Sequence, residues 1–212
     1  VADGPALATN GLPWTMVQTW ALRLGHPEAA EHATAQLAAP IENTQYLGRI
    51  LHALSAGPSA SDLKSAVPAS IDFGCYLPSV QIMVARDPAP AGSGLTLALK
   101  GGHNAENHNH NDVGSIVVAV DGVPLLVDAG KPTYTAKTFG QLRYEERCMQ
   151  SRWHSTPAPF GRGQLAERNY AATLVKEPDT GLSAMSLELA SAYDLPENSH
   201  WSRSAGLDRA HG

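Results

Sequence analysis

The side chains best suited to bind a metal ion are concentrated in the middle of the chain. His103, His108 and His110 lie within eight positions, and Asp128 follows at the end of an apolar run. Another histidine, His154, comes 26 positions after that acid. Paired imidazoles and a carboxylate are ligands that divalent transition metals prefer. The pattern His-x-His, an acid at a strand end and a distant histidine therefore indicates a divalent metal site on a β-sheet.

The geometry of β-strands predicts how the histidines and Asp128 would come together. Residues i and i+2 of a strand share a face, so His108 and His110 project into one site if their segment is extended. The Asp-Gly turn signal at 121–122 returns the chain, which brings Asp128 near the start of the hairpin. His110, Asp128 and His154 would then supply a Zn²⁺ site, with an open position or completed by a water. The alternative is a solvated polar loop with one histidine packed in the core.

Composition indicates an ordinary globular protein and narrows its partners. The chain has 212 residues, of which 43% are hydrophobic and 17% charged. Its net charge is -5, so the chain lacks the excess of basic residues typical of nucleic-acid-binding proteins, and we expect no nucleic-acid partner. An acidic polymer would have to bind at a local basic patch. No apolar run approaches the roughly 18 residues of a membrane span, so we expect no membrane partner. The N-terminus shows no signal-peptide pattern.

The first part of the chain is predicted to form amphipathic helices. Pro13 suits the first turn of one helix, Gly25 ends it and Pro27 begins a second. Asn43 caps a predicted third helix, with apolar residues at helical spacing up to residue 54. So few helices cannot bury their apolar faces on one another, and we expect them to be the end of a larger helical array.

The rest of the chain is predicted to form an antiparallel sheet domain. A Gly-, Pro-, Ser- and Ala-rich linker at 56–70 precedes a change to strand-like alternation. Strands are expected at 80–85, 95–99, 115–120, 124–127, 171–175 and 184–189, the last two as a pair. The predicted fold is α+β and multidomain, with a short helical segment and linker at 1–66 and an antiparallel β-sandwich at 67–212.

Several motifs together resemble the heparinase II/III family of polysaccharide lyases. In chain order they are His-x-His-x-Asp at 108–112, Asp-x-Gly at 128–130, Tyr134, the pair Arg143-Tyr144, and His154. The resemblance covers roughly residues 70–212. It implies a helical α/α toroid followed by an antiparallel β-sandwich, with this chain beginning late in the first and stopping early in the second. It also favours a periplasmic or secreted location.

The resemblance also implies roles for individual residues. His110, Asp128 and His154 match the family's zinc ligands, and His108 matches a histidine that takes part in catalysis. Tyr134 is a second catalytic candidate, for which packing at a strand end is the alternative. The metal is zinc or another divalent ion, with a structural or a catalytic role.

Three further residues are candidates for substrate binding. Glu106 and Asn107 lie beside the His-x-His motif, and amide side chains can bind sugar hydroxyls. Arg143 would meet an anionic sugar, although a structural ion pair is an equal alternative. His103 could line the same cleft.

The expected activity is cleavage of an acidic, uronic-acid-containing polysaccharide by β-elimination. In the family, the main catalytic tyrosine and a carboxylate-neutralising residue come from the toroid, so we expect this chain alone to be a weak or inactive lyase. A non-catalytic, metal-stabilised carbohydrate-binding β-module is the alternative. A cupin-like metal oxygenase is disfavoured by the helices before the sheet. An incomplete sheet would expose its edges, so self-association is expected.

Overall fold

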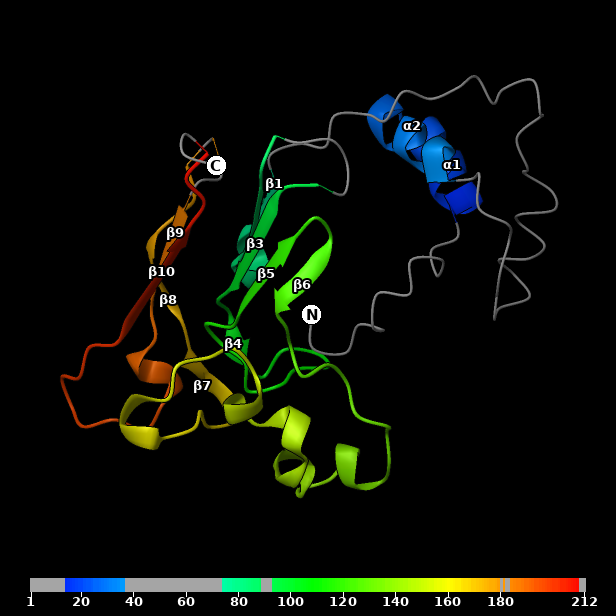
Figure 1. Ribbon diagram of the computed structural model, residues 1–212. Helices are drawn as coiled ribbons and strands as arrows, with labels where there is room; N and C mark the ends of the chain where they lie inside the picture. Colours follow the sequence, from blue (N-terminus) through cyan, green and yellow to red (C-terminus); the bar gives the residue numbers. More distant parts are fainter. Residues whose placement is uncertain (1–13, 37–73, 89–92, 180, 182–183, 210–212) are drawn as a thin grey trace. The chain divides into compact units, whose positions relative to one another are not determined.

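The computed structural model describes residues 14–36, 74–88, 93–179, 181 and 184–209 (Figure 1). The chain divides into two compact units, one of residues Ala6–Ser70 and one of Ile71–Gly212 with Val1–Pro5. The predicted third helix, the linker and the predicted domain boundary after residue 66 lie outside the described residues.

Two helices are described in the first unit, as the sequence predicts. They are α1, Trp14–Arg23, and α2, Pro27–Gln36, and Gly25 between them has a positive φ of 71°. Ala21 of the first helix is buried, as are Ala30 and Ala33 of the second, and such small side chains let two helices approach closely. Within the described residues, no helix has the length and apolarity that crossing a membrane requires.

The second unit is built on a five-stranded antiparallel sheet of order β1-β2-β3-β5-β6 (Figure 1). Its strands are β1 Gly74–Leu77, β2 Ile82–Arg86, β3 Leu95–Lys100, β5 Ile116–Val120 and β6 Val123–Leu126. The predicted hairpin is confirmed, because β5 pairs with β6 across Asp121 and Gly122. These two residues have φ of 51° and 75°, the left-handed pair that a tight type I′ hairpin turn requires.

Two smaller antiparallel sheets and a series of short turns complete this unit. The three-stranded sheet has the order β10-β9-β8, and a second pair joins β4 to β7. The strands are β4 His103–Asn104, β7 Glu167–Ala171, β8 Thr173–Lys176, β9 Ala184–Glu188 and β10 Ser202–Gly206. The 3-10 turns are η2 Pro78–Val80, η3 Lys137–Phe139, η4 Arg143–Glu145, η5 Arg147–Met149, η6 Ser151–Trp153, η7 Pro159–Gly161 and η8 Ala190–Ala192. The predicted pairing of the strands now called β8 and β9 is confirmed.

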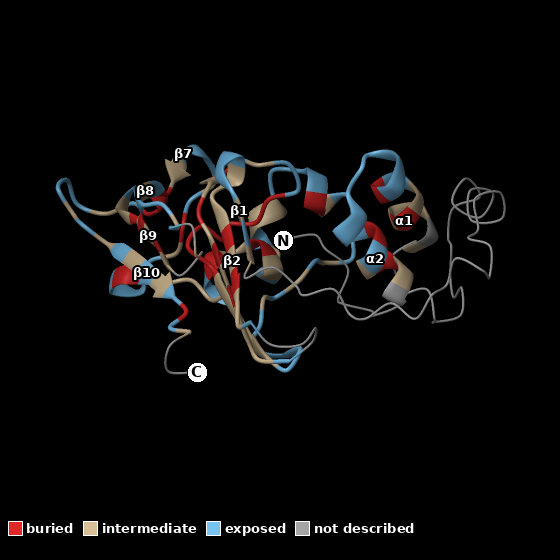
Figure 2. Ribbon diagram, turned by 90° about the horizontal axis from the view of Figure 1, so that it is seen from above, coloured by how far each residue is buried: buried red, intermediate tan, exposed pale blue. Residues whose placement is uncertain are grey.

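Side chains from the two larger sheets share one hydrophobic core. Met83 of β2, Leu99 of β3 and Leu187 of β9 are fully buried members of the same cluster. Figure 2 shows the buried positions along these strands in red. The fold is thus a small α+β fold with predominantly antiparallel sheets, and its shared core fixes the strand ends from which the loops of the candidate site begin.

We expect Gly114→Ala to destabilise the second unit more than Gly130→Ala. Both glycines have a positive φ, 80° and 70°, which costs other residues about 1–2 kcal/mol. A Cβ at Gly114 would also lie 2.6 Å from Leu189 Cδ1, whereas a Cβ at Gly130 would meet nothing within 4 Å. We expect losses of about 3 and about 1 kcal/mol, measured by urea unfolding. Equal losses would contradict this account of the contact with Leu189.

Candidate metal centre

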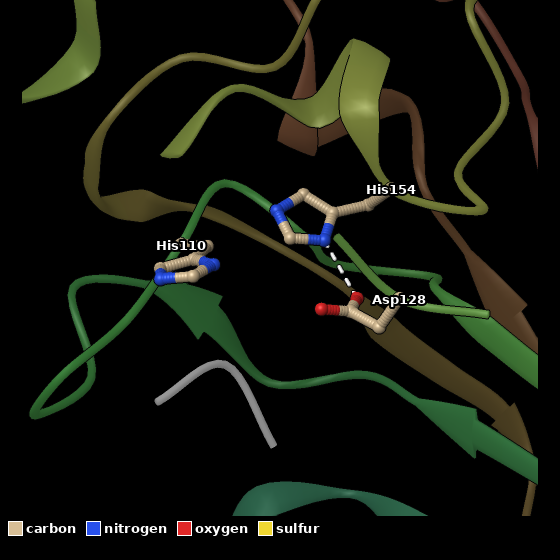
Figure 3. Close-up of side chains that lie close together, drawn as sticks. All are labelled: His110, Asp128 and His154. Carbon is tan, nitrogen blue, oxygen red and sulfur yellow. Dashed lines mark hydrogen bonds and ion pairs between the residues drawn. The ribbon is translucent and has the colours of Figure 1, made fainter. Parts of the chain in front are cut away.

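Three side chains from separate segments converge on one site (Figure 3). His110 lies in the loop between β4 and β5, Asp128 lies two residues beyond β6, and His154 directly follows η6. One possible ligand atom from each lies within 4.8 Å of the other two. The His110 residue is fully buried, the His154 side chain is fully buried, and the Asp128 side chain is 20% exposed. The predicted set of three residues is therefore brought together, and it could hold a metal ion.

Hydrogen bonds at both ring nitrogens fix the orientation of His154. Its Nδ1 lies 2.6 Å from Asp128 Oδ2, and its Nε2 lies 2.8 Å from the carbonyl oxygen of Cys148. Because a carbonyl oxygen can only accept, Nε2 must carry a hydrogen, which leaves Nδ1 as the nitrogen directed at the site. A histidine that donates its second N–H to a backbone carbonyl is the usual arrangement of a metal-ligating imidazole.

The Asp128 carboxylate and the His154 imidazole each shift the pKa of the other. Burial lowers the pKa of His154, but the hydrogen bond to Asp128 and its charge outweigh burial and raise it above 6.5. Burial raises the pKa of Asp128, but His154 and the Gly130 N–H, 2.9 Å away, outweigh it and lower the value. The imidazole stabilises the fold below its ordinary pKa and loses that effect as the pH rises through the raised value. The carboxylate loses its effect as the pH falls through the lowered value, so the pair stabilises most between the two.

We expect metal binding at this site to release a proton at pH 6.5. Without metal, the raised pKa of His154 keeps a proton on Nδ1, and a metal ligand must be deprotonated. Zinc affinity should therefore fall about tenfold for each pH unit below that pKa. Titration calorimetry of zinc in two buffers of different ionisation heat at pH 6.5 would measure the released proton. A binding heat independent of the buffer would contradict this expectation.

The loop that carries His110 is a compact turn, so residues 108–110 do not meet the condition of an extended backbone under which His108 and His110 would share one site. His108 has a φ of 55°, and the Asn109 N–H donates to Glu106 O at 3.3 Å to close the turn. As a result His108 is exposed while His110 is fully buried. The alternation that places i and i+2 on one face applies only to extended backbone, and the left-handed residue removes it here. The two histidines are therefore in different environments.

A lysine joins the two ends of this loop. Lys100 Nζ forms an ion pair with Asp112 Oδ1 and lies 3.5 Å from Glu106 Oε2. The three side chains are only 11%, 2% and 19% exposed. Glu106, a predicted substrate-binding residue, also accepts the His103 N–H at 3.4 Å. The carboxylate thus has a structural role in the loop, where ion pairs removed from water are screened less than surface pairs.

Arg143 also supports this loop. Its guanidinium donates to Asn109 O at 2.5 Å and to Thr138 O at 2.9 Å. These bonds tie the residue before His110 to the 3-10 turns η3 and η4. Arg143, predicted to bind substrate, therefore has both terminal nitrogens engaged with backbone carbonyls.

Two other predicted residues are more open. Asn107 is exposed at the tip of the His110 loop. The Tyr134 side chain is 39% exposed and packs edge-on against Phe139, with 5.4 Å between ring centroids. Neither belongs to the three-residue group that could hold a metal.

A buried glutamine that the sequence analysis missed organises the loop from inside. Gln164 Oε1 accepts from Asn104 Nδ2 at 3.1 Å and from Val113 N at 3.0 Å. Its Nε2 donates to Val113 O at 2.6 Å and to Tyr193 Oη at 3.1 Å. Its partners lie between 29 and 60 positions away, and a single glutamine in a polar stretch gives no sequence signal for such a role.

No protein family matches this chain, and no curated protein matches it. The site is thus interpreted from its own chemistry. Its donors are two nitrogens and one carboxylate, one ring is oriented by a second hydrogen bond, and only the carboxylate is open to solvent. Mg²⁺ and Ca²⁺ prefer sets made of oxygen, so the residues fit a borderline transition metal better.

Proposed function

We propose that this chain belongs to a polysaccharide lyase that cleaves a uronic-acid-containing glycan by β-elimination, with zinc held by His110, Asp128 and His154. The observation that carries the proposal is the convergence of these three side chains from three distant segments. It agrees with the motif order on which the resemblance to heparinase II/III lyases rests. In this proposal the sheets form an antiparallel sandwich, and α1 and α2 belong to the end of a helical toroid.

The bound zinc would supply a fixed positive charge that holds the His110 loop, the end of β6 and the turn η6 together. Lys100 and Arg143 brace the loop on either side of His110. His108, two positions before that ligand, is exposed and so can meet a substrate in solution. We therefore assign the metal a positioning role, with His108 presented at the surface beside it.

The reaction needs a base, a group that neutralises the uronate carboxylate, and an acid. The base takes the C5 proton, the electron pair forms the C4=C5 bond, and the C4–O bond breaks. The departing oxygen then receives a proton, so no water is consumed. An imidazole exchanges protons near neutral pH, which suits His108 as the base or the neutralising group. Tyr134 is the second candidate, because a phenol can donate to the leaving oxygen.

An absorbance assay for the new C4=C5 bond tests this activity directly. We expect the zinc-loaded chain to form unsaturated uronate ends slowly, because the resemblance assigns further catalytic groups to the helical domain. His108→Ala should abolish the signal while leaving the zinc content unchanged. His200→Ala, which removes an exposed histidine outside the candidate site residues, is the matched control. Product formation that His108→Ala leaves unchanged would contradict the assigned role.

A metal-stabilised carbohydrate-binding module is the second candidate function. It needs only a surface on a metal-held loop, and the contacts of Glu106 and Arg143 give these two charged side chains a structural role in holding that loop. The same preparation would then bind uronate oligosaccharides saturably but form no unsaturated product, even after prolonged incubation with zinc.

A further inference from the structure

A basic and aromatic segment runs alongside the metal centre. Residues 131–162 carry six basic and two acidic side chains, although the whole chain has a net charge of -5. The basic residues are Lys131, Lys137, Arg143, Arg147, Arg152 and Arg162, and the acidic ones are Glu145 and Glu146. In Figure 1 this segment is the yellow-green to yellow part, made of short turns beyond the ends of the strands. An acidic polymer would need such a local basic patch, because the net charge of the chain is negative.

Exposed aromatic rings gather in the same segment. Five aromatic side chains are exposed among the described residues, and four of them lie between residues 134 and 160. These four are Tyr134, Phe139, Trp153 and Phe160. Rings that remain open to solvent beside cationic groups can stack on the apolar face of a sugar while the cations meet its acid group.

Several basic side chains of the segment already have partners. Lys137 pairs with Glu145 at 2.9 Å, and Arg162 lies 3.7 Å from Asp194. Arg143 is bound to carbonyl oxygens, as described above. These contacts already occupy part of the hydrogen-bonding capacity of the three side chains.

Arg147 and Arg152 differ from them. Both are exposed, and neither forms an ion pair with any residue in the part of the chain that the structure describes. The Arg147 guanidinium lies over the ring of Trp153, 5.2 Å from its centroid. Stacking uses the flat face of a guanidinium and leaves its in-plane N–H fork open to a carboxylate. The indole, at 48% exposure, still presents apolar surface.

This stacked pair is continuous with the metal centre. Arg147 begins η5 and is followed by Cys148, whose carbonyl oxygen orients His154. Trp153 ends η6 and is followed by His154 itself. A ligand held by the stack would thus lie on the same two turns that carry one side of the metal centre.

We propose that Arg147, Arg152 and Trp153 form a binding subsite for a carboxylated sugar unit of an acidic glycan. The assignment rests on the substrate class of the proposed function and adds the residues that recognise it. A uronate unit offers a planar carboxylate to the arginine fork and an apolar C–H face to the indole. Nucleic acid is disfavoured, because it requires many phosphate contacts and gains from a positive overall field, whereas this chain is acidic.

Calorimetry with the zinc-loaded full chain and hexasaccharides of galacturonate and of mannuronate tests the subsite. We expect one of the two to bind, and Arg147→Gln and Trp153→Ala each to weaken that binding about tenfold. Arg152→Gln should weaken it about threefold to tenfold. Lys176→Gln, which removes one exposed charge from β8, should leave the binding affinity unchanged. A neutral hexasaccharide should not bind. Thermal unfolding of each variant confirms that the fold is retained.

The possible outcomes separate this proposal from the lyase proposal. Uronate binding that depends on Arg147 and Trp153 without any unsaturated product would support the subsite and count against the lyase. Product formation with a KM unaffected by Arg147→Gln would support the lyase and overturn the subsite. Binding of neither hexasaccharide would overturn the subsite, as would stronger binding of single-stranded oligonucleotide through the same residues.

Discussion

Replacing His110 with alanine is expected to abolish stoichiometric zinc binding, whereas replacing His108 is expected to leave it intact. His110 is fully buried and belongs to the three-residue group, while His108 is exposed on a left-handed turn two positions earlier. Loss of one of three protein ligands should weaken zinc binding more than the roughly 10- to 100-fold that loss of a supporting residue costs. Mass spectrometry of purified protein should show about one zinc per wild-type chain and less than about 0.1 in His110→Ala.

A second histidine variant shows whether the loss of zinc is specific to a residue of the three-residue group or follows from removing any histidine. His200, with a side chain 87% exposed, lies outside the group, and His200→Ala should retain wild-type zinc. Competition with a chromophoric chelator gives the affinities of all the variants. Equal loss of zinc in His108→Ala and His110→Ala would contradict the site as described. No zinc in the wild type would leave the three residues as a structural ion pair with a packed imidazole.

Gln164→Ala is expected to be among the most destabilising single substitutions in the second unit. Its amide makes four hydrogen bonds to three partners in a region where it is only 6% exposed. Alanine would leave the Val113 N–H and carbonyl without their bonds to the Gln164 amide, and each buried unsatisfied group costs about 1–3 kcal/mol. Asn104 Nδ2 would lose one of its two hydrogen bonds and keep the one to Leu165 O. Partial relaxation of the loop reduces the sum, so we expect a loss of roughly 3–5 kcal/mol in the free energy of unfolding.

Two further variants define what the amide contributes. Gln141→Ala removes an exposed glutamine and should change stability by less than about 0.5 kcal/mol in the same urea unfolding experiment. Gln164→Glu keeps the volume but replaces the donor to Val113 O with an acceptor, so it should also be strongly destabilising and should weaken zinc binding. A Gln164→Glu protein with wild-type stability would show that packing, and not hydrogen bonding, is what Gln164 supplies.

The strands that the sequence predicts are those in which apolar and polar residues alternate. This alternation arises because one face of each strand is buried in the shared core. It identifies β2, β3, β5, β6, β8 and β9, and the Asp-Gly turn signal gives the hairpin. The pattern misses β1 and β10. It also misses β4, which has only two residues, and β7, whose sequence ERNYA is largely polar and exposed. Such strands are held by their partners and not by their own alternation.

The same distinction applies to the site. The three possible ligands could be predicted because their residue types are unusual and their order follows the hairpin. The conformation of the loop could not, since His108 adopts a left-handed backbone that favours glycine or asparagine, and no local signal marks it. The roles of Lys100, Arg143 and Gln164 depend on contacts with residues distant in the chain. Such contacts cannot be predicted from a single sequence.

One arginine of β10 connects two of the segments that carry the site. Arg203 Nη1 donates to Gly114 O at 2.8 Å and to Ser155 O at 2.6 Å, across 89 and 48 positions. Gly114 follows the loop of His110, and Ser155 follows His154. During synthesis both ligand segments emerge well before the side chain that joins them, and contacts of such long sequence separation form slowly. We therefore expect the metal centre to reach its final form late, after the strand furthest along the described chain has docked.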